Sequence, residues 1–474
     1  MSVPTMPIRR PDTGVASGTR SGFEPGTAPG TPPAGLPRLL PPSIDAPESL
    51  RDHVGRHGHL TYRNGRLRLI RDIEASGLTG RGGAAFPVHR KLAAVAGAGA
   101  RPFVVANGSE GEPASSKDSS LLWLAPHLVL DGIQLAAEAV GAEEACLCLH
   151  GSPGDRLASS IEHALTVRWN QRLDRVPVRL AFTPPRFLAG QETATVNLLN
   201  GGLALPTYTP PPVFERGVGG APTLVQNVET LAHVALIGRY GPRWFRGVGT
   251  DAEPGSMLAT IRYAGGGARI IEAAIGTPLS SLLRADLRDF LHANQAEPGG
   301  SGPASPAAQR TQAVLVGGYH GTWIPAARAA RLTLENATLR RVGASVGAGV
   351  VAALPAGRCG LAETARVASY LALESAGQCG PCLNGLPRIA DALSELAGPR
   401  PRPRVREDIE RWAELVKGRG ACHHPDGSVR FVTSALATFE AEISRHTRGV
   451  CSATSRQPFL PLPRDIPASD EDWS

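Results

Sequence analysis

The first half of the chain alternates between strand-like and helix-like spacing of its apolar residues. Short apolar runs that are typical of buried strands lie at Arg101–Asn107, Ala145–His150 and Val176–Phe182. Residues Trp123–Ala142 repeat apolar positions at the helical period, with Pro126 in the first turn, where proline is tolerated. Because strands, helices and glycine loops alternate up to about residue 235, we expect an α/β layer architecture there.

The pattern changes character after residue 255. Three short strands next to glycines are predicted at Met257–Tyr263, Ala268–Ala274 and Ala313–Gly318. A helix over Thr277–Arg284 is indicated by Thr277 as its N-cap and Pro278 at its first helical position. This combination indicates a small β-grasp-like module. The insert Gln295–Arg310 is of low complexity, and we interpret it as a surface loop.

From Ala362 onward the spacing is helical. The expected helices are Ala362–Glu374, Leu383–Ala397, Val405–Lys417 and Ser434–His446, which would form a small bundle with cysteines in its connections. Both ends of the chain have few apolar anchors, and we expect them to be disordered. The predicted organisation is a tail (1–45), an α/β domain (46–235), a β-grasp-like domain (236–345), a helical domain (346–447) and a second tail (448–474).

Composition narrows the classes of protein to be considered. The chain has 474 residues, of which 42% are hydrophobic and 19% charged, so most of it should be globular. Its net charge of +7 comes without any Lys/Arg-rich block interleaved with aromatic residues, which argues against nucleic-acid binding. No stretch reaches the length of a membrane-spanning helix, and the N-terminus lacks an apolar signal-peptide core. We expect a cytoplasmic protein, alone or at the periphery of a membrane complex.

The most informative run is E-S-A-G-Q-C-G-P-C-L-N-G (Glu374–Gly385), which contains Cys379 and Cys382 and precedes Cys422 by some distance. A Cys-x-x-Cys pair lets one turn direct two thiolates at one site, as in iron–sulfur and zinc centres. A C-x-x-C-x-x-C motif would need a further cysteine where this chain has Ala376. The run therefore looks like a metal-cluster motif without one of its ligands. The remaining cysteines follow no such pattern, and we expect Cys146 and Cys148 in the core and Cys451 in the tail.

Four further motifs follow one another in the first half of the chain. The loop G-R-G-G-A-A-F (Gly80–Phe86) would let backbone amides approach a phosphate, with Arg81 and Lys91 as neutralising cations. N-G-S-E-G-E-P follows a predicted strand, at the place where loops of open α/β sheets bind ligands. G-Q-E-T-A (190–194) and P-T-L-V-Q-N-V-E-T (222–230) complete the series.

Together with the cysteine run, these motifs resemble the flavin-carrying subunit of respiratory complex I and its relatives in bidirectional hydrogenases and NAD-linked formate dehydrogenases. The resemblance covers roughly residues 60–446. It implies an FMN domain, a β-grasp-like soluble-ligand-binding (SLBB) domain and a helical bundle with a [4Fe-4S] cluster. In this family NADH reduces FMN by hydride transfer, and the flavin passes single electrons to the cluster. The implied partner is a ferredoxin-like or thioredoxin-like iron–sulfur electron-carrier protein or subunit.

The implied flavin site can be carried over residue by residue. The phosphate-side loop matches at Gly80, Arg81, Gly82, Gly83 and Lys91. The flavin-facing positions are Asn107, Ser109, Glu110, Gly190, Gln191, Glu192, Thr193, Thr223, Gln226 and Asn227, with Glu110 as the expected catalytic residue. Ser109 stands where the family has aspartate, Gln191 where it has glutamate and Gln226 where it has asparagine. Each of these replacements keeps hydrogen-bonding capacity.

The implied NADH side departs further from the family pattern. Phe86 matches an aromatic residue that stacks on the nicotinamide nucleotide, and Glu112 matches a carboxylate that binds hydroxyls. The second aromatic position falls at Ala94, and the family's K-P-P-F run becomes T-P-P-P (Thr209–Pro212). Each lost stack removes about 1 kcal/mol. Two lost aromatics and a lost cation would weaken NADH binding by roughly two powers of ten.

The implied ligands of the cluster are Cys379, Cys382 and Cys422, which leaves several outcomes open. The cluster could use another fourth ligand, for which Cys359, His423 and His424 are candidates; it could be a labile three-iron form; or it could be lost. A zinc site with three cysteines and one histidine is a further possibility. Three hypotheses for the function therefore remain. The protein is an NADH-oxidising flavoprotein subunit, a ferredoxin-linked flavoprotein that does not use NADH, or a non-catalytic paralogue without cofactors.

Overall fold

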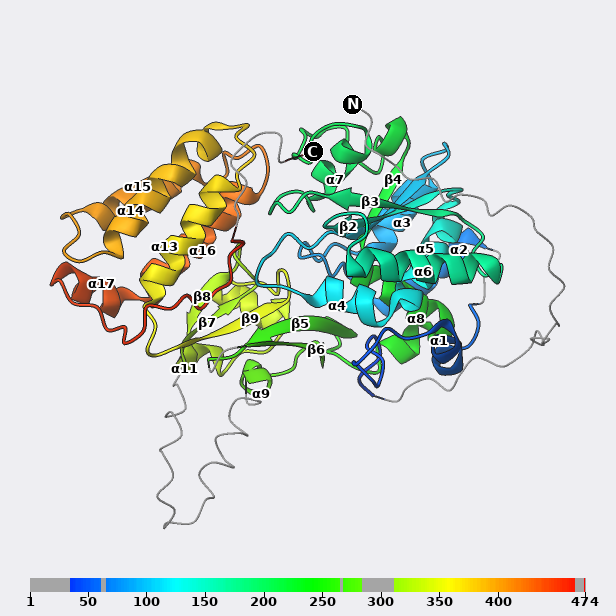
Figure 1. Cartoon of the computed structure of the whole chain (residues 1–474), viewed down its shortest axis with the longest axis horizontal. Helices are drawn as coiled ribbons and strands as arrows, with labels where there is room; N and C mark the ends of the chain where they lie inside the picture. Colours follow the sequence, from blue (N-terminus) through cyan, green and yellow to red (C-terminus); the bar gives the residue numbers. More distant parts are fainter. Residues whose placement is uncertain (1–34, 61–64, 265–266, 284–310, 465–472, 474) are drawn as a thin grey trace, which may run out of the picture.

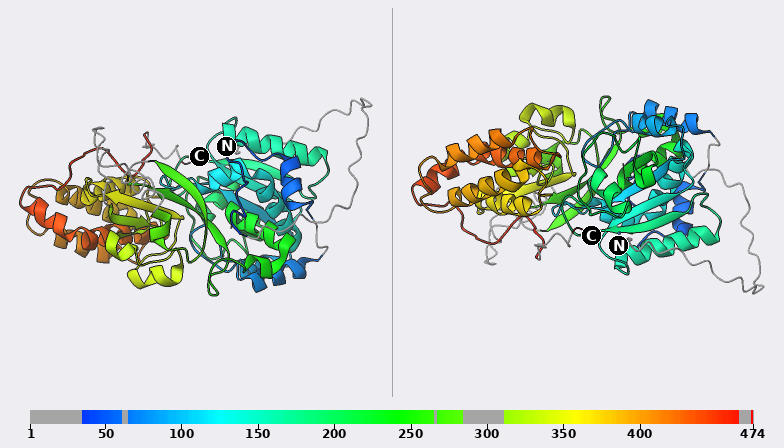
Figure 2. Two further views of the ribbon diagram at one scale, coloured as in Figure 1. Left: turned by 90° about the horizontal axis from the view of Figure 1, so that it is seen from below. Right: turned by 90° about the horizontal axis from the view of Figure 1, so that it is seen from above.

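The structure is a computed structural model that describes residues 35–60, 65–264, 267–283, 311–464 and 473. A first sheet with its helices forms one end of the molecule, a second sheet lies in the middle, and the C-terminal helices form the other end (Figure 1). The views from below and above show the same lengthwise order (Figure 2). The insert Gln295–Arg310 and the surface loop predicted there lie outside the described residues.

The first sheet is parallel and four-stranded, in the order β3-β2-β1-β4. Its strands are β1 (Phe103–Gly108), β2 (Ala145–His150), β3 (Val178–Thr183) and β4 (Thr223–Asn227). The accompanying helices are α1 (Leu50–His57), α2 (Arg66–Ser76), α3 (Val88–Ala96), α4 (Lys117–Leu124), α5 (Pro126–Val140), α6 (Arg156–Asn170), α7 (Glu192–Leu199), the short helix η1 (Val218–Gly220) and α8 (Val228–Phe245). The predicted α/β architecture is confirmed.

Alternate residues of the first sheet enter two different cores, as the pleat of a strand requires. Val104 and Ala106 join the large core that also holds the buried faces of α5 and α8. Val105 joins the core on the opposite face, together with Cys146 and Cys148. These two thiols are therefore packing residues, as predicted.

The second sheet has five strands in the order β6-β5-β9-β7-β8. They are β5 (Ser256–Arg262), β6 (Ala268–Ala274), β7 (Thr311–Val316), β8 (Thr322–Pro325) and β9 (Val350–Pro355). β5 and β9 pair in parallel, whereas β5–β6, β7–β8 and β7–β9 are antiparallel. The connections contain α9 (Leu279–Leu283), α11 (Ala326–Ala329), α12 (Asn336–Leu339) and η2 (Arg340–Val342). The three strands predicted for this part of the chain are present.

The C-terminal part consists of helices that pack on one another. They are α13 (Gly360–Leu373), the π-helical turn η3 (Pro381–Gly385), α14 (Leu386–Leu396), α15 (Val405–Val416), α16 (His424–Thr438) and α17 (Glu440–Thr447). α13 packs against α14 and α16, α14 against α15, and α16 also against β8 of the second sheet. One core therefore joins these helices to the second sheet.

Two predicted helices are in fact interrupted. The segment expected to be helical over Trp123–Ala142 breaks at Ala125, which has φ −130° and ψ 55°. The residue before a proline avoids helical angles, so Pro126 starts a new helix instead of continuing the first. The segment expected over Ser434–His446 breaks at Phe439 (φ −106°, ψ 27°), whose ring packs directly on Gly360.

The predicted tails are wrong at their inner ends, because each contains an anchored segment. Residues of the first tail donate backbone N–H groups to Oε2 of the buried Glu272, from Arg38 and from Leu39 at 2.8 Å each. In the second tail, Leu460 is fully buried and donates to Glu363 at 3.0 Å. Each segment supplies backbone N–H donors to a buried carboxylate, which would otherwise lack hydrogen-bond partners. The composition of the tails gives no sign of this interaction.

Within the described part of the chain, no single helix is long and apolar enough to cross a membrane. α4 and α5 pass that test only as a pair, bent by 97°.

A buried polar cluster holds the helices behind the first sheet. Asp131 of α5 accepts hydrogen bonds from His53 at 2.7 Å and from Arg168 at 2.7 Å, and pairs with Arg239. Burial opposes ionisation of Asp131, but Arg239, Arg168 and His53 outweigh it and hold its pKa well below the usual value. His57 and His127 stack near His53.

We predict that the stability of the protein falls as the pH drops below about 6.5, the usual pKa of histidine. Burial, followed by nearby positive groups, lowers the pKa of His57 to about 2 and that of His127 to about 3. The unfolded chain therefore binds protons that the folded protein excludes. Each imidazole should remove about 1.4 kcal/mol of unfolding free energy per pH unit. Denaturant unfolding at pH 7, 6 and 5 measures this slope. The double variant His57→Gln/His127→Gln should make it less steep, while burial of His233, His320 and His424, which also lowers their pKa values, keeps a residual slope. If the unfolding free energy of that variant depended on pH as steeply as that of the parent protein, His57 and His127 would not be the cause.

Candidate functional site

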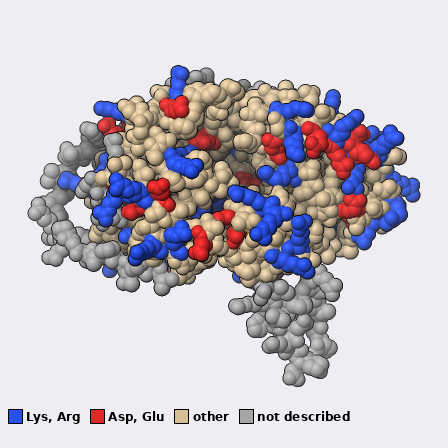
Figure 3. Space-filling view, turned by 180° about the vertical axis from the view of Figure 1, so that it is seen from behind, with Lys and Arg blue, Asp and Glu red and all other residues tan. Residues whose placement is uncertain are grey.

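A cavity of about 300 Å³ opens where the first sheet, the second sheet and the C-terminal helices meet. Its lining includes Asn107 at the end of β1 and Asn227 at the end of β4, which are register partners. The chain leaves β1 toward β2 on one side, whereas β4 lies on the other, so this is the point where strand order reverses. Ligands of open α/β sheets bind at such a point. From behind, the surface is hollowed between the two ends of the molecule, with acidic side chains inside the hollow (Figure 3).

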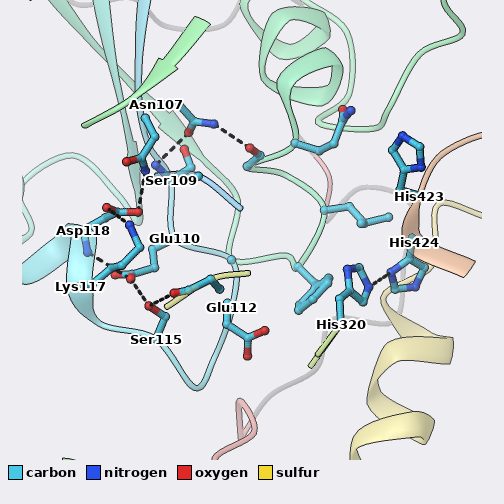
Figure 4. A pocket seen from close by; sticks show the side chains of 18 of the residues that line it. Asn107, Ser109, Glu110, Glu112, Ser115, Lys117, Asp118, His320, His423 and His424 are labelled. Atoms are coloured by element: carbon cyan, nitrogen blue, oxygen red, sulfur yellow. Dashed lines mark hydrogen bonds and ion pairs between the residues drawn. The ribbon is translucent and has the colours of Figure 1, made fainter. Parts of the chain in front are cut away.

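The cavity contains only some of the predicted cofactor residues. Those that line it are Arg81, Gly82, Asn107, Ser109, Glu110, Glu112, Gly190, Gln191 and Asn227. The other predicted residues do not line it: Gly80 and Gly83 line a smaller neighbouring pocket, Thr223 lies at the opposite end of β4, and Phe86, Lys91, Glu192, Thr193 and Gln226 line neither pocket. The lining also includes Ser115, Lys117, Asp118, Phe187, His320, Cys422, His423 and His424, which sequence reasoning had not assigned to this site. Figure 4 shows Ser109, Glu110, Lys117 and Asp118 on one side of the cavity and the three histidines on the other.

The glycine loop between α2 and α3 is closed by a hydrogen bond from Gly80 N–H to the Phe86 carbonyl at 2.9 Å. Gly83 has φ 101°, in the left-handed region that favours glycine, and packs against Gly347 of the second sheet. Gly82 lies so close to Asn227 that a Cβ would stand 3.3 Å from its side chain. The loop thus places backbone atoms without side chains beside the end of β4.

The two cations of this loop bind protein groups. The buried Arg81 donates to Thr79 at 3.0 Å and to the Pro254 carbonyl at 3.3 Å, and burial lowers its pKa. Lys91 donates to Glu192 at 2.6 Å and to a β4 carbonyl at 3.0 Å. Backbone amides and helix N-termini, more than free cations, would therefore meet a phosphate here.

Amide side chains fix the rim of the cavity. Asn107 donates to the Gly190 carbonyl at 2.7 Å, which joins the β1 loop to the loop before α7. Gln191 accepts from Thr193 and Ala194 and caps α7, while Asn227 accepts from Glu229 and caps α8. An amide oxygen thus serves as the cap acceptor at Gln191, so the replacement noted in the sequence keeps the local geometry.

The predicted catalytic residue Glu110 is held by four donors. Its oxygens accept from Ser115 at 2.6 Å, from Asp118 N–H at 3.2 Å, and from the hydroxyl and N–H of Ser119 at 2.8 and 3.1 Å. This arrangement places a fixed negative charge at the N-terminus of α4, where it is electrostatically favoured. Geometry therefore gives Glu110 a positioning role, and its catalytic role stays a prediction.

Glu112 is the carboxylate of the cavity that can exchange a proton near neutrality. Burial raises its pKa to about 7, although backbone N–H groups of Tyr319 and Ala114 oppose the shift. The Tyr319 N–H lies 2.7 Å from one carboxylate oxygen, so the second sheet positions this side chain. Gly318 has no room for a side chain, since a Cβ would stand 2.4 Å from the same oxygen.

Lys117 is the central charged group that sequence reasoning missed. Its ammonium donates to Asp118 at 2.7 Å and to the fully buried Glu229 at 2.8 Å. Glu229 also accepts the Leu258 N–H at 2.8 Å, which ties β5 of the second sheet to α8. Burial alone would lower the pKa of Lys117, but the two carboxylates raise it. The sequence did contain one indication of this charged group, the adjacent residues Lys117 and Asp118, which follow the N-G-S-E-G-E-P run.

The predicted metal ligands lie on the opposite wall. Cys379 and Cys382 stand at the start of the π-helical turn, a geometry that recurs at functional sites. Burial, followed by the neighbouring Cys379 thiol, raises the pKa of Cys382 to about 12. Cys422 also interacts electrostatically with Cys379, and it lines the cavity. The structure thus brings the three cysteines together, next to Ala376 in the same loop.

The structure also sorts the candidates for a fourth ligand. Cys359 caps the N-terminus of α13, whereas the cysteine loop follows its C-terminus, about 20 Å away at 1.5 Å per residue. His424 is occupied on both nitrogens, by His320 at 3.0 Å and by the Leu371 carbonyl at 2.8 Å. Both are therefore unsuited to complete this site. His423 lies beside Cys422 in the cavity wall and is the histidine that stays a candidate.

One buried ion pair fastens the flavin-side loop to the cysteine loop. Glu374, the first residue of the cysteine run, accepts from Arg186 at 3.1 Å and from the Phe187 N–H at 2.7 Å. The exposed fractions of the two charged side chains are only 1% and 3%. The Phe187 ring meets His320, in the turn between β7 and β8, edge-on at 4.8 Å, and lies near Tyr370 and His424 of the helical part.

Comparisons with known proteins match both ends of the molecule. Residues 73–236 match the Nuo51 FMN-binding domain, and residues 362–446 match the NADH-ubiquinone oxidoreductase-F iron-sulfur binding region. The NADH-quinone oxidoreductase F 2 subunit of Rhizobium meliloti (strain 1021) is 27% identical over 387 residues, covering 80% of this chain and 88% of that protein. The corresponding F subunit of Streptomyces coelicolor is 27% identical over 392 residues, covering 80% and 83%.

Among solved structures, the chain is similar to one in the crystal structure of NAD+-reducing [NiFe]-hydrogenase in the H2-reduced state. The TM-score is 0.69 and the identity 27%, with 81% of this chain covered. This chain spans 65% of that hydrogenase chain.

We predict that Glu374→Ala lowers the free energy of unfolding by about 3–5 kcal/mol, because it leaves the Arg186 charge buried without its partner. Chemical denaturation of the purified protein measures this loss. In the double variant Arg186→Met/Glu374→Ala no unpaired charge remains, so the loss should be smaller than in the single variant. Equal or greater loss in the double variant would show that the charge pair is not the cause.

Proposed function

We propose that this chain, a divergent member of the flavin-carrying F-subunit family of NADH-quinone oxidoreductases, binds FMN at the ends of β1 and β4 and passes its electrons to an iron–sulfur centre. The two family models together span more than half of the chain. When bound, FMN would supply hydride acceptance and release of single electrons. The residues of the chain bind it, orient it and exclude water.

The observation that carries this proposal is that one cavity touches both halves of the electron path. Asn107 and Gly190 line it from the FMN-binding region, and Cys422 lines it from the iron–sulfur region. Electron transfer requires that the flavin and the iron–sulfur centre lie close together. With both held at this cavity, no helix or strand would have to move to bring them close. The Glu374–Arg186 pair keeps the two walls in register.

The cavity suits a flavin in its size and chemistry. Its volume of about 300 Å³ lies at the lower end of the range for small-molecule sites, roughly 300–1,000 Å³. Gly82 and Gly190 let the backbone approach closely, and the neighbouring amides of Asn107 and Gln191 offer donors for polar ring atoms. Glu112, with a pKa of about 7, can hold or release a proton beside the reacting ring.

The iron–sulfur centre would be held by Cys379, Cys382 and Cys422. Thiolates on a cluster bind different irons and so stand farther apart than ligands of one zinc ion. Among the described residues, the group of donor atoms that all lie within 4.8 Å of one another does not include these three cysteines. This favours a cluster over a single zinc ion at the cysteine loop. Ala376 leaves one corner open, which His423 or an external ligand would fill.

We also propose the finer division of the chain. Residues 46–235 would be the FMN domain, 236–345 the β-grasp-like SLBB domain and 346–447 the iron–sulfur domain. The parallel pairing of β5 and β9 inside an otherwise antiparallel sheet supports a β-grasp-like second domain, but β9 lies beyond residue 345, so this domain would end after β9. The helix bundle α13–α17 supports the third.

A partner that carries electrons onward would bind at the cysteine loop. Leu373 and Leu383 flank that loop, and their exposed fractions are 61% and 62%. Large exposed apolar side chains beside a redox loop are suited to a transient contact. We propose a soluble iron–sulfur electron carrier or subunit there, within a multisubunit complex.

A second candidate function, a flavoprotein whose reductant is not NADH, is supported by the aromatic residues of the NADH side. Phe86 is 51% exposed, and the half-buried Ala94 of α3 gives it no aromatic partner. Thr209 and Pro212 stand where the family has a lysine and an aromatic residue. NADH would then bind weakly while the flavin site stays intact.

We predict that Ser109→Trp abolishes FMN binding, because the indole would fill the cavity at the end of β1. Flavin retained after reconstitution and gel filtration of the purified variant measures this. Ser152→Trp is the matched control: the same substitution, made just after the end of β2 at an exposed residue, should retain flavin. Circular dichroism verifies that both variants are folded. Full flavin content in the folded Ser109 variant would contradict the assigned site.

We predict that Ala94→Phe strengthens NADH binding by roughly two- to tenfold, since an added aromatic contact contributes about 0.5–1.5 kcal/mol. Bleaching of the bound flavin during an anaerobic NADH titration measures the affinity. Ala93→Phe, one position away on the exposed face of α3, should leave it unchanged. If both variants bleach like the parent protein, Ala94 does not face the nucleotide.

A further inference from the structure

A second group of metal-binding side chains lies far from the cysteine loop. It comprises Cys359 before α13, Glu442 and His446 on α17, and Cys451 in the segment that follows α17. One donor atom from each residue lies within 4.8 Å of every other. The first three residues are buried, and Cys451 is exposed. Spacing in the sequence gave no indication of this group, because Cys359 comes from a distant segment.

The distances within the group match those between ligands of one small ion. Cys359 Sγ lies 3.6 Å from His446 Nε2, and Glu442 Oε1 lies 3.2 Å from the same nitrogen. With bonds of about 2.3 Å to sulfur and about 2.0 Å to nitrogen or oxygen, a tetrahedral zinc ion separates such pairs by roughly 3.3–3.5 Å. The donors could therefore converge on one ion after small shifts of their side chains.

The surrounding hydrogen bonds orient the donors inward. His446 Nδ1 lies 3.2 Å from the Leu396 carbonyl. A carbonyl only accepts, so Nδ1 carries a proton, and Nε2 is the ring nitrogen directed at Cys359 and Glu442. Ser452 donates both its N–H, at 2.7 Å, and its hydroxyl, at 2.6 Å, to Glu442. Ligand histidines and carboxylates of metal sites are held by outer contacts of this kind.

We propose that Cys359, Glu442, His446 and Cys451 bind one zinc ion, separate from the iron–sulfur centre. Two thiolates with one imidazole and one carboxylate in a tetrahedral arrangement favour zinc over magnesium or calcium. The site joins the start of α13 to the end of α17 and to the segment that leads to the buried Leu460. The ion is structural: it fastens the C-terminal segment to the helical domain.

The test is the zinc content of full-length protein, purified anaerobically with a thiol reductant and supplied with zinc. We expect about one zinc ion per chain in the parent protein. Cys359→Ser/Cys451→Ser should lose it. The matched variant Cys379→Ser/Cys382→Ser/Cys422→Ser removes thiols of the other group and should keep it. Loss of zinc only in this matched variant would overturn the proposal and place the ion at the cysteine loop.

A milder variant guards against loss of folding in the double mutant. Ser452→Ala keeps all four ligands and removes one contact to Glu442, so zinc affinity should fall by roughly ten- to hundredfold. Competition with a chromophoric chelator measures this, and cobalt substitution should give thiolate charge-transfer absorption in the parent protein. An unchanged affinity in Ser452→Ala, or reduced parent protein that takes up no zinc, would overturn the proposal. So would a Cys359–Cys451 disulfide that persists under reductant, found by mass spectrometry of alkylated protein.

Discussion

The buried pair of Glu374 and Arg186 is the contact on which the arrangement of the site depends. It joins a loop of the first sheet to the first residue of the cysteine run, and the adjacent Phe187 N–H shares the carboxylate. An ion pair at 1% and 3% exposure allows little freedom, because separating the charges would leave each without an opposite charge in a place that water does not reach. The two walls of the cavity therefore hold a fixed separation, which electron transfer between them requires.

Lys117 performs the same task between the two sheets. Its ammonium is shared by Asp118 and Glu229, and Glu229 in turn binds the backbone of β5. Buried charges thus tie the first sheet and its helices to the second sheet, through Lys117 and Glu229, and to the cysteine loop, through Glu374. Such ties contribute little net stability when both partners are counted, but breaking one is costly. They fix geometry more than they hold the fold together.

Sequence reasoning succeeded where the determinant was local. The strand Arg101–Asn107 ends near its predicted boundary because a short apolar run and the polar loop after it are both formed by consecutive residues. The motifs that contain Gln191 and Asn227 were likewise recognisable from consecutive residues, although the structure alone shows that both side chains cap helices. It failed where the determinant was a distant partner: Leu39 and Leu460 look like tail residues until Glu272 and Glu363 appear beside them. Lys117 was missed for the same reason, since its partner Glu229 lies far along the chain.

The cysteines show why spacing alone could not decide which thiols act together. Cys359 was a candidate for the cluster because it lies within reach along the sequence of Cys379, yet a rigid helix separates them. The same helix brings Cys359 beside Cys451, which sequence reasoning had assigned to a tail. A helix of this length places residues that are near in the sequence far apart in space. The packing of α17 brings Cys451 close to Cys359 in space, although the two are far apart in the sequence. Thiols at the two ends of α13 therefore belong to two separate groups, one beside the cavity and one where the C-terminal segment is attached.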